Sequence, residues 1–168
     1  MADARSREVV DSVPVGYAPN GFAIHPDGGR LYVTSVYGDV TEIDMRTDAV
    51  LRTFSPGGVP QGALVSKDGS ELYVANEAGW LDVYDLTSGN NVARVPLAAG
   101  GFGVALSPDL MHLYVSLPAA GKVQVVNTAS RTIIHTIETG GRPRRIAFDY
   151  HGAIAVVANE AGSVDFVR

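Results

Sequence analysis

Short apolar stretches alternate with turn residues along the whole chain. Residues 81–84 (Leu-Asp-Val-Tyr) and 123–126 (Val-Gln-Val-Val) place apolar side chains on one face, as half-buried strands do. Leu-Tyr-Val runs that begin at Leu31, Leu72 and Leu113 are rich in β-forming residues. No segment keeps a helical period over the ~11 residues that an amphipathic helix needs. The pattern therefore predicts an all-β fold of short strands.

The strands recur as four repeats. The repeats read PNGFAIHPDGGRLYVTS, PQGALVSKDGSELYVAN, GFGVALSPDLMHLYVSL and PRRIAFDYHGAIAVVAN, and they start at Pro19, Pro60, Gly101 and Pro143. A turn position keeps the same spacing and holds Asp27, Asp68, Asp109 and His151. Repeats of about 40–45 residues with four strands each are typical of β-propeller blades. The sequence thus predicts a single β-propeller domain over residues 1–168, with four four-stranded antiparallel blades.

The repeat motifs also carry a family resemblance. Leu-Tyr-Val-Thr at 31–34, Leu-Tyr-Val-Ala-Asn at 72–76 and Leu-Tyr-Val-Ser at 113–116 each follow a Pro-Asp or Lys-Asp turn, and they resemble the YVTN family of β-propeller repeat proteins. The fourth repeat is degenerate, with Ala-Val-Val-Ala-Asn at 155–159. The resemblance implies a surface-layer-like or lactonase-like propeller, which is WD40-like in blade length but lacks the Gly-His and Trp-Asp pairs. It also suggests an extracytoplasmic location.

The chain ends are in phase with the repeats. The segment from Asp3 aligns with the segment from Asn127, whereas the fourth repeat stops before its own fourth strand. We therefore expect residues 8–13 to pair beside residues 164–167 and to complete the last blade, which removes an exposed edge. Three arrangements stay open: a closed four-bladed monomer, two chains in an eight-bladed ring with C2 symmetry, and a fragment of a larger propeller.

Composition narrows the function classes. The 168 residues include no Cys, which excludes disulfides, thiolate zinc sites and cysteine nucleophiles. The net charge of −5 argues against a nucleic-acid partner. No apolar run approaches the ~20 residues of a membrane span, and the N-terminal segment lacks the apolar core of a signal peptide. The four His occupy different repeat positions, so we expect no metal site, no cofactor and no catalytic set.

Departures from the repeat consensus mark the candidate ligand-binding residues. In a propeller, the first strand of each blade lines the channel, which places four side chains at equivalent positions on one rim: Asn20, Gln61, Phe102 and Arg144. Neighbouring loops add Glu77, Glu160 and Trp80 on the same side. The fourth repeat departs most strongly, because it places Arg142, Arg144 and Arg145 at this rim.

These arginines allow two interpretations. Guanidinium groups bind carboxylates and phosphates through paired hydrogen bonds, so the cluster could hold a small anionic ligand. Alternatively, Glu77 and Glu160 could neutralise it internally. Trp80 suits either ligand stacking or packing between blades. We expect a non-enzymatic binding or scaffold propeller that recognises a protein or small ligand through its channel face. The alternative from the resemblance is a propeller enzyme of lactonase or lyase type.

Overall fold

The computed structural model describes residues 2–3, 8–9, 11–149 and 154–168, and every regular element in these ranges is a strand. The predicted turn residue His151 and the strand residue Val10 lie outside the described residues. The described part of the chain contains no helix that is long and apolar enough to cross a membrane.

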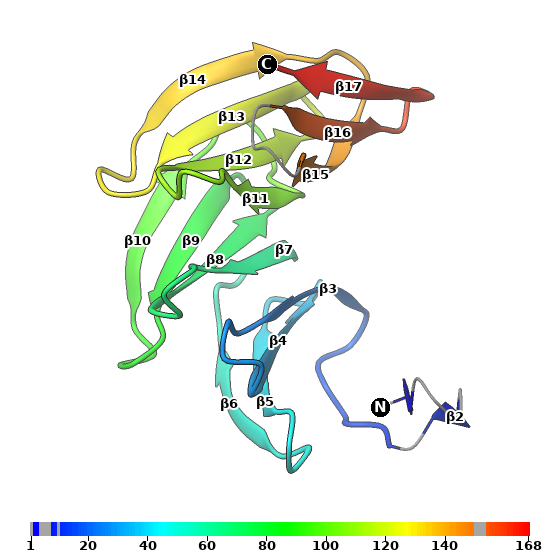
Figure 1. Cartoon of the computed structure of the whole chain (residues 1–168), viewed down its shortest axis with the longest axis vertical. Helices are drawn as coiled ribbons and strands as arrows, with labels where there is room; N and C mark the ends of the chain where they lie inside the picture. The colour runs from blue at the N-terminus through cyan, green and yellow to red at the C-terminus, as the bar shows by residue number, and fades with distance from the viewer. Residues whose placement is uncertain (1, 4–7, 10, 150–153) are drawn as a thin grey trace.

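The strands form four blades in chain order (Figure 1). Blade 1 contains β3 (Pro19–Ile24), β4 (Arg30–Ser35), β5 (Val40–Asp44) and β6 (Val50–Phe54). Blade 2 contains β7 (Pro60–Val65), β8 (Glu71–Asn76), β9 (Trp80–Asp85) and β10 (Asn91–Pro96). Blade 3 contains β11 (Val104–Leu106), β12 (His112–Leu117), β13 (Lys122–Asn127) and β14 (Ile133–Glu138). Blade 4 contains β15 (Pro143–Phe148), β16 (Ala155–Asn159) and β17 (Ser163–Val167).

All pairings within the blades are antiparallel between consecutive strands, so the all-β propeller fold and its four blades are confirmed. Turn chemistry positions these strands. Asp27 Oδ1 accepts a hydrogen bond from the Gly29 amide at 2.8 Å, and Asp109 Oδ1 accepts one from the Met111 amide at 2.9 Å. Asp68 does the same for Ser70 at 3.1 Å. The equivalent aspartates therefore cap the first hairpin of blades 1, 2 and 3.

The core lies between blades. We call the side of a blade toward the preceding blade its rear face and the other side its forward face. The forward face of blade 1, with Tyr32 and Val40, forms one buried cluster with the rear face of blade 2, with Leu72 and Val74. A second cluster joins the forward face of blade 2 to the rear face of blade 3. Blades 1, 2 and 3 are thus stabilised by apolar burial against one another.

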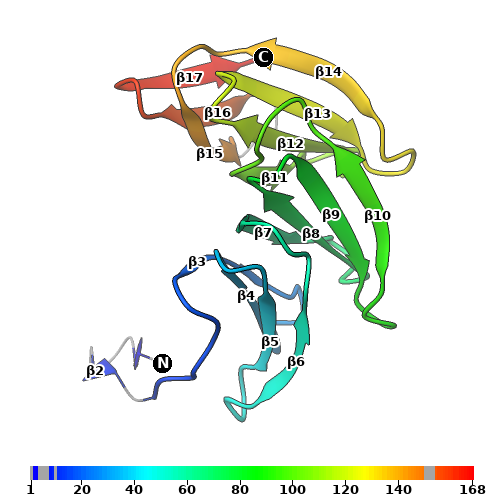
Figure 2. The same ribbon diagram turned by 180° about the vertical axis from the view of Figure 1, so that it is seen from behind.

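One expectation about the chain ends is wrong. Neither β2 (Glu8–Val9) nor residues 11–13 pair beside residues 164–167. Instead β2 pairs with β1 (Ala2–Asp3), and β17 pairs only with β16, so blade 4 has three strands among the described residues. The physical reason is the position of the two end blades. The four blades follow one another along an open arc with blades 1 and 4 at its two ends, and the described segment just before β3, residues 11–18, runs away from blade 4 in both views (Figures 1 and 2).

Close approach between the innermost strands constrains the backbone. A Cβ on Gly21 would lie 2.1 Å from the carbonyl oxygen of Gln61, and a Cβ on Gly103 would lie 2.1 Å from that of Arg144. Only glycine fits where neighbouring backbones come this close. This packing brings the rim positions of successive blades side by side.

Candidate functional site

The four rim residues of the first strands are joined in neighbouring pairs. The Asn20 side-chain amide donates a hydrogen bond to the side-chain oxygen of Gln61, which links blades 1 and 2. The Arg144 guanidinium lies 4.2 Å from the ring centre of Phe102, a cation–π contact that links blades 3 and 4. The structure therefore brings together the positions that repeat equivalence placed on one rim.

Glu160 neutralises part of the arginine cluster. Its carboxylate lies 2.8 Å from Arg144 Nε and 3.1 Å from Arg142 Nε. The hydrogen bond from Arg144, together with the charges of Arg144 and Arg142, lowers the pKa of Glu160 below its ordinary value. Glu77 contributes a longer contact of 3.8 Å to Arg144 Nη1. Internal pairing thus accounts for two of the three arginines.

Arg145 is the exception in this cluster. Its guanidinium lies 4.9 Å from the Phe102 ring centre, on the same ring that Arg144 contacts. The residue is exposed, and it forms no salt bridge with the described part of the chain. Arg145 therefore presents a guanidinium whose hydrogen-bond donors face solvent rather than a carboxylate of its own chain.

Trp80 is half-buried at the start of β9. The Arg94 guanidinium covers its ring at 4.4 Å from the centroid, and Arg94 in turn bonds the buried Asp82 carboxylate at 2.7 Å. A Cβ on Gly58 would lie 3.1 Å from the indole, so the loop before blade 2 also lies against it. These contacts describe packing within blade 2 and its preceding loop, and none of them involves the arginine cluster.

Asn76 and Asn159 were not among the predicted site residues, yet they build the loops that carry Glu77 and Glu160. Asn159 Oδ1 accepts hydrogen bonds from the amides of Arg142 at 2.7 Å and Ala161 at 3.1 Å. Asn76 makes the equivalent bonds to the Val59 and Ala78 amides. The signal was present in the shared Asn-Glu-Ala-Gly sequence of both loops, because an asparagine side chain readily caps backbone amides.

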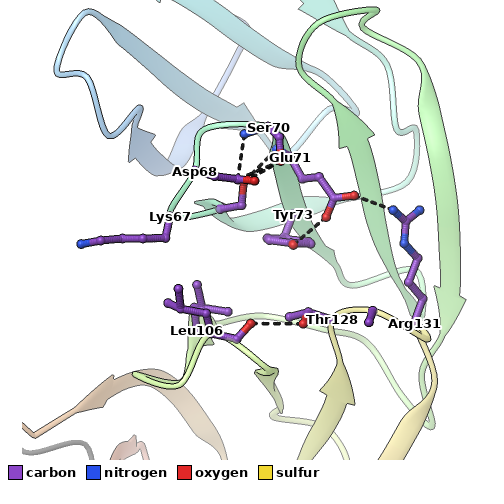
Figure 3. A pocket seen from close by; sticks show the side chains of 11 residues that line it. Lys67, Asp68, Ser70, Glu71, Tyr73, Leu106, Thr128 and Arg131 are labelled. Carbon is purple, nitrogen blue, oxygen red and sulfur yellow. Dashed lines mark hydrogen bonds and ion pairs between the residues drawn. The ribbon is translucent and has the colours of Figure 1, made fainter.

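A pocket of about 410 Å³ opens between blades 2 and 3 at the end of the blades opposite the rim. Figure 3 shows the Glu71 carboxylate between the Tyr73 hydroxyl and the Arg131 guanidinium. Tyr73 donates to Glu71 at 2.7 Å, and Arg131 forms a salt bridge with Glu71 across the two blades. Burial, and then the hydrogen bond to Glu71 and the charge of that carboxylate, raise the pKa of Tyr73, whereas the charge of Arg131 lowers it. The polar lining of the pocket is thus used to join blades 2 and 3.

The described residues contain no group of three or more His, Asp or Glu side chains placed to hold a metal ion. His25 illustrates the structural use of these groups. Its Nδ1 lies 2.8 Å from the Asp27 carboxylate, and its Nε2 lies 3.1 Å from the Gly69 carbonyl oxygen in the next blade.

Comparison with known proteins supports the class of fold. The chain is similar in structure to Kuenenia stuttgartiensis hydrazine synthase, with a TM-score of 0.84 and 24% identity over 95% of this chain and 49% of that chain. It is also similar to U3-55K, with a TM-score of 0.78 and 15% identity over 89% of this chain and 48% of that chain. The chain thus spans about half the length of these two structures.

The chain is therefore a β-propeller protein by fold. No protein-family profile matches the sequence, and no curated protein matches it either. The YVTN resemblance of the Leu-Tyr-Val motifs accordingly stays a prediction. At these sequence identities the two solved structures inform the fold and not the activity.

Proposed function

We propose that this β-propeller is a non-enzymatic binding module, which recognises a carboxylate-bearing protein segment at the rim formed by Phe102, Arg142, Arg144 and Arg145. The single observation that carries this proposal is the placement of Arg145. Its exposed guanidinium lies on Phe102 without a carboxylate partner in the described residues, while its two neighbouring arginines are held by Glu160.

The rim favours an anionic partner for a simple electrostatic reason. Three guanidinium groups face two carboxylates, from Glu77 and Glu160, so the cluster keeps an excess of positive charge on a chain whose net charge is −5. A carboxylate that binds Arg145 would form charge-assisted hydrogen bonds without displacing an existing salt bridge. Phe102 fixes the plane of the guanidinium and lowers the entropy that binding must remove.

The proposal is tested with a fluorescent oligoglutamate peptide and fluorescence anisotropy. Arg145→Ala should weaken binding by roughly tenfold, the lower range of a charge-assisted hydrogen bond at an exposed site. Arg46→Ala is the matched control, because Arg46 is an exposed arginine in the turn at the opposite end of blade 1. Equal loss in both variants would show non-specific charge attraction, and no effect of Arg145→Ala would contradict the proposed site.

A further inference from the structure

Both ends of the arc carry large apolar side chains that are exposed, whereas the faces between blades 1 and 2 and between blades 2 and 3 form buried clusters. Part of the rear face of blade 1 is covered, since Ile43 is 4% exposed. On the rear face of blade 1, Phe22 is 69% exposed and Ile24 is 50% exposed. On the forward face of blade 4, Val164 is 54% exposed and Phe166 is 62% exposed. Contiguous apolar surface of this kind marks interaction sites on soluble proteins.

By these definitions, each contact between neighbouring blades in the described part of the chain joins a forward face to a rear face. Blade 1 meets blade 2 in this way, and blade 2 meets blade 3 in the same way. The arc leaves over one rear face, on blade 1, and one forward face, on blade 4. A second copy of the chain presents one face of each kind.

On each end face, one side chain differs in size from its equivalents in the other repeats. The first three repeats place Tyr32, Tyr73 and Tyr114 on their forward faces, whereas the fourth repeat has the smaller Val156 at this position. The rear faces of the later repeats carry Ala63, Val104 and Ile146, whereas blade 1 carries the larger Phe22. At these two positions a large residue replaces smaller ones on blade 1 and a small residue replaces tyrosines on blade 4. Elsewhere on the forward face of blade 4, Phe166 replaces the smaller Val83 and Val125, so this face still offers a large apolar side chain.

We propose that two copies of this chain associate head to tail through these faces, with the rear face of blade 1 of each copy on the forward face of blade 4 of the other. Two such contacts close an eight-bladed ring with C2 symmetry. The interface is heterologous at the level of the faces, and the two-fold axis makes its two occurrences identical. The second copy would also bring its residues 11–18, which form no strand in the structure, toward the open edge of β17.

Arg145 makes the proposed contact between two copies looser than the contacts between neighbouring blades of one chain. Gly21, Gly62 and Gly103 allow the next blade to approach closely, but the fourth repeat has Arg145 there. A Cβ at this position would collide with a carbonyl oxygen placed as in the internal interfaces. The second copy therefore contacts blade 4 through the outer part of its face, around Val164 and Phe166, and leaves the arginine cluster at the rim open.

The mass of the purified chain in solution, measured by light scattering after gel filtration, tests the proposal. We expect twice the mass of one chain. Phe22→Asp and Phe166→Asp should each yield monomers with an unchanged β circular dichroism spectrum, because each places a charge in both contacts of the ring. Val92→Asp is the control, since Val92 is 45% exposed on the outer strand of blade 2, and it should remain a dimer.

Mixing the two monomeric variants provides the sharper measurement. In a mixed pair, one contact carries both aspartates and the other is wild type, so the mixture should recover dimers that neither variant forms alone. Arg145→Gly should shift the dissociation of the dimer to a lower protein concentration, because it restores the residue of the internal interfaces. A monomeric wild-type chain, an open series of larger species, or a mixture that stays monomeric would overturn the proposal.

Discussion

Blades 2 and 4 hold their first three strands at the same repeat positions, yet the side chains of these strands meet different surroundings. Leu81 and Val83 of blade 2 are 0% and 1% exposed. Their equivalents in blade 4, Val164 and Phe166, are 54% and 62% exposed. The alternating pattern therefore determines that a strand forms, but the neighbouring blade determines whether its apolar face becomes core.

The polar groups of the two blades show the same difference. Asp82 of blade 2 is fully buried, and the outer strand β10 supplies Arg94 and Asn91 to its carboxylate at 2.7 and 2.9 Å. The equivalent Asp165 of blade 4 is half-buried, and it bonds Asn159 and Ser163 of its own sheet. An outer strand thus allows a carboxylate to be buried, because it provides the partners that a buried charge requires.

The largest loss of stability expected from this comparison follows the substitution of Leu81. Leu81→Ala removes side-chain atoms from a closed core and should lower the free energy of unfolding by about 2–5 kcal/mol. Val164→Ala, measured in the Phe22→Asp background that keeps blade 4 uncovered, should change it by less than about 0.5 kcal/mol. Urea denaturation followed by circular dichroism measures both values. Similar losses at the two positions would show that blade 4 is as well covered as blade 2.

The repeat period predicted the blades because the turn chemistry repeats with it. Aspartates at 27, 68 and 109 cap equivalent hairpins, and strand boundaries follow from them. The same reasoning failed for the N-terminal strand. Repeat alignment identifies which segment is equivalent to an outer strand. It does not say which blade that segment pairs with, or whether that blade belongs to the same chain or to a second copy. Closure of the arc depends on the angle between packed blades, which the sequence pattern does not encode.

Part of the candidate site was predictable for the same reason. Equivalence of position placed Phe102 and Arg144 on one rim, and the structure places their side chains in contact. The surroundings of Trp80 were not predictable in this way. The residues at its equivalent positions, Asp39 and Lys122, are polar and give no sign of a covered ring, but Arg94 from the adjacent strand covers the ring of Trp80. Such a contact across strands depends on two residues that no single repeat position describes.

A smaller loss of stability is expected at Asp68, in the turn between β7 and β8 of blade 2. Hydrogen bonds from the Ser66 hydroxyl, and then from the Ser70 amide and hydroxyl, lower the pKa of Asp68 to about 2. Because this pKa is below that of the unfolded chain, the stabilisation is complete above pH ~4 and is lost as the pH falls through about 2. Asp68→Asn should therefore cost about 0.5–2 kcal/mol at pH 6, similar to the loss of a helix cap.

This prediction is tested by the pH dependence of the difference in the free energy of unfolding between the wild type and Asp68→Asn. Urea denaturation of the wild type and of Asp68→Asn should give curves that converge as the pH falls toward 2. Asp11→Asn, in the exposed N-terminal segment, is the control and should show no such convergence. If the difference in the free energy of unfolding between Asp68→Asn and the wild type is constant at all pH values, the asparagine side chain fails to cap the turn for a steric reason. The loss of the carboxylate charge would then not be the cause. In blade 4, Asp149 accepts the Ile154 amide at the equivalent hairpin.

The smallest effect concerns the Asn-Glu-Ala-Gly loops, where blades 2 and 4 have identical sequences but different neighbours. Glu160 is held by Arg144 and Arg142, whereas Glu77 has only the 3.8 Å contact with Arg144. Arg144→Ala should raise the pKa of Glu160 toward its ordinary value, because it removes the hydrogen bond that contributes most to the lowering. Carbon-detected NMR titration of the glutamate carboxyl groups measures this shift directly. Arg46→Ala, which removes the same charge at the opposite end of blade 1, should leave Glu160 unchanged. If Arg144→Ala also leaves it unchanged, Arg142 alone is sufficient to hold the carboxylate, and Arg144 is free to bind the same ligand as Arg145.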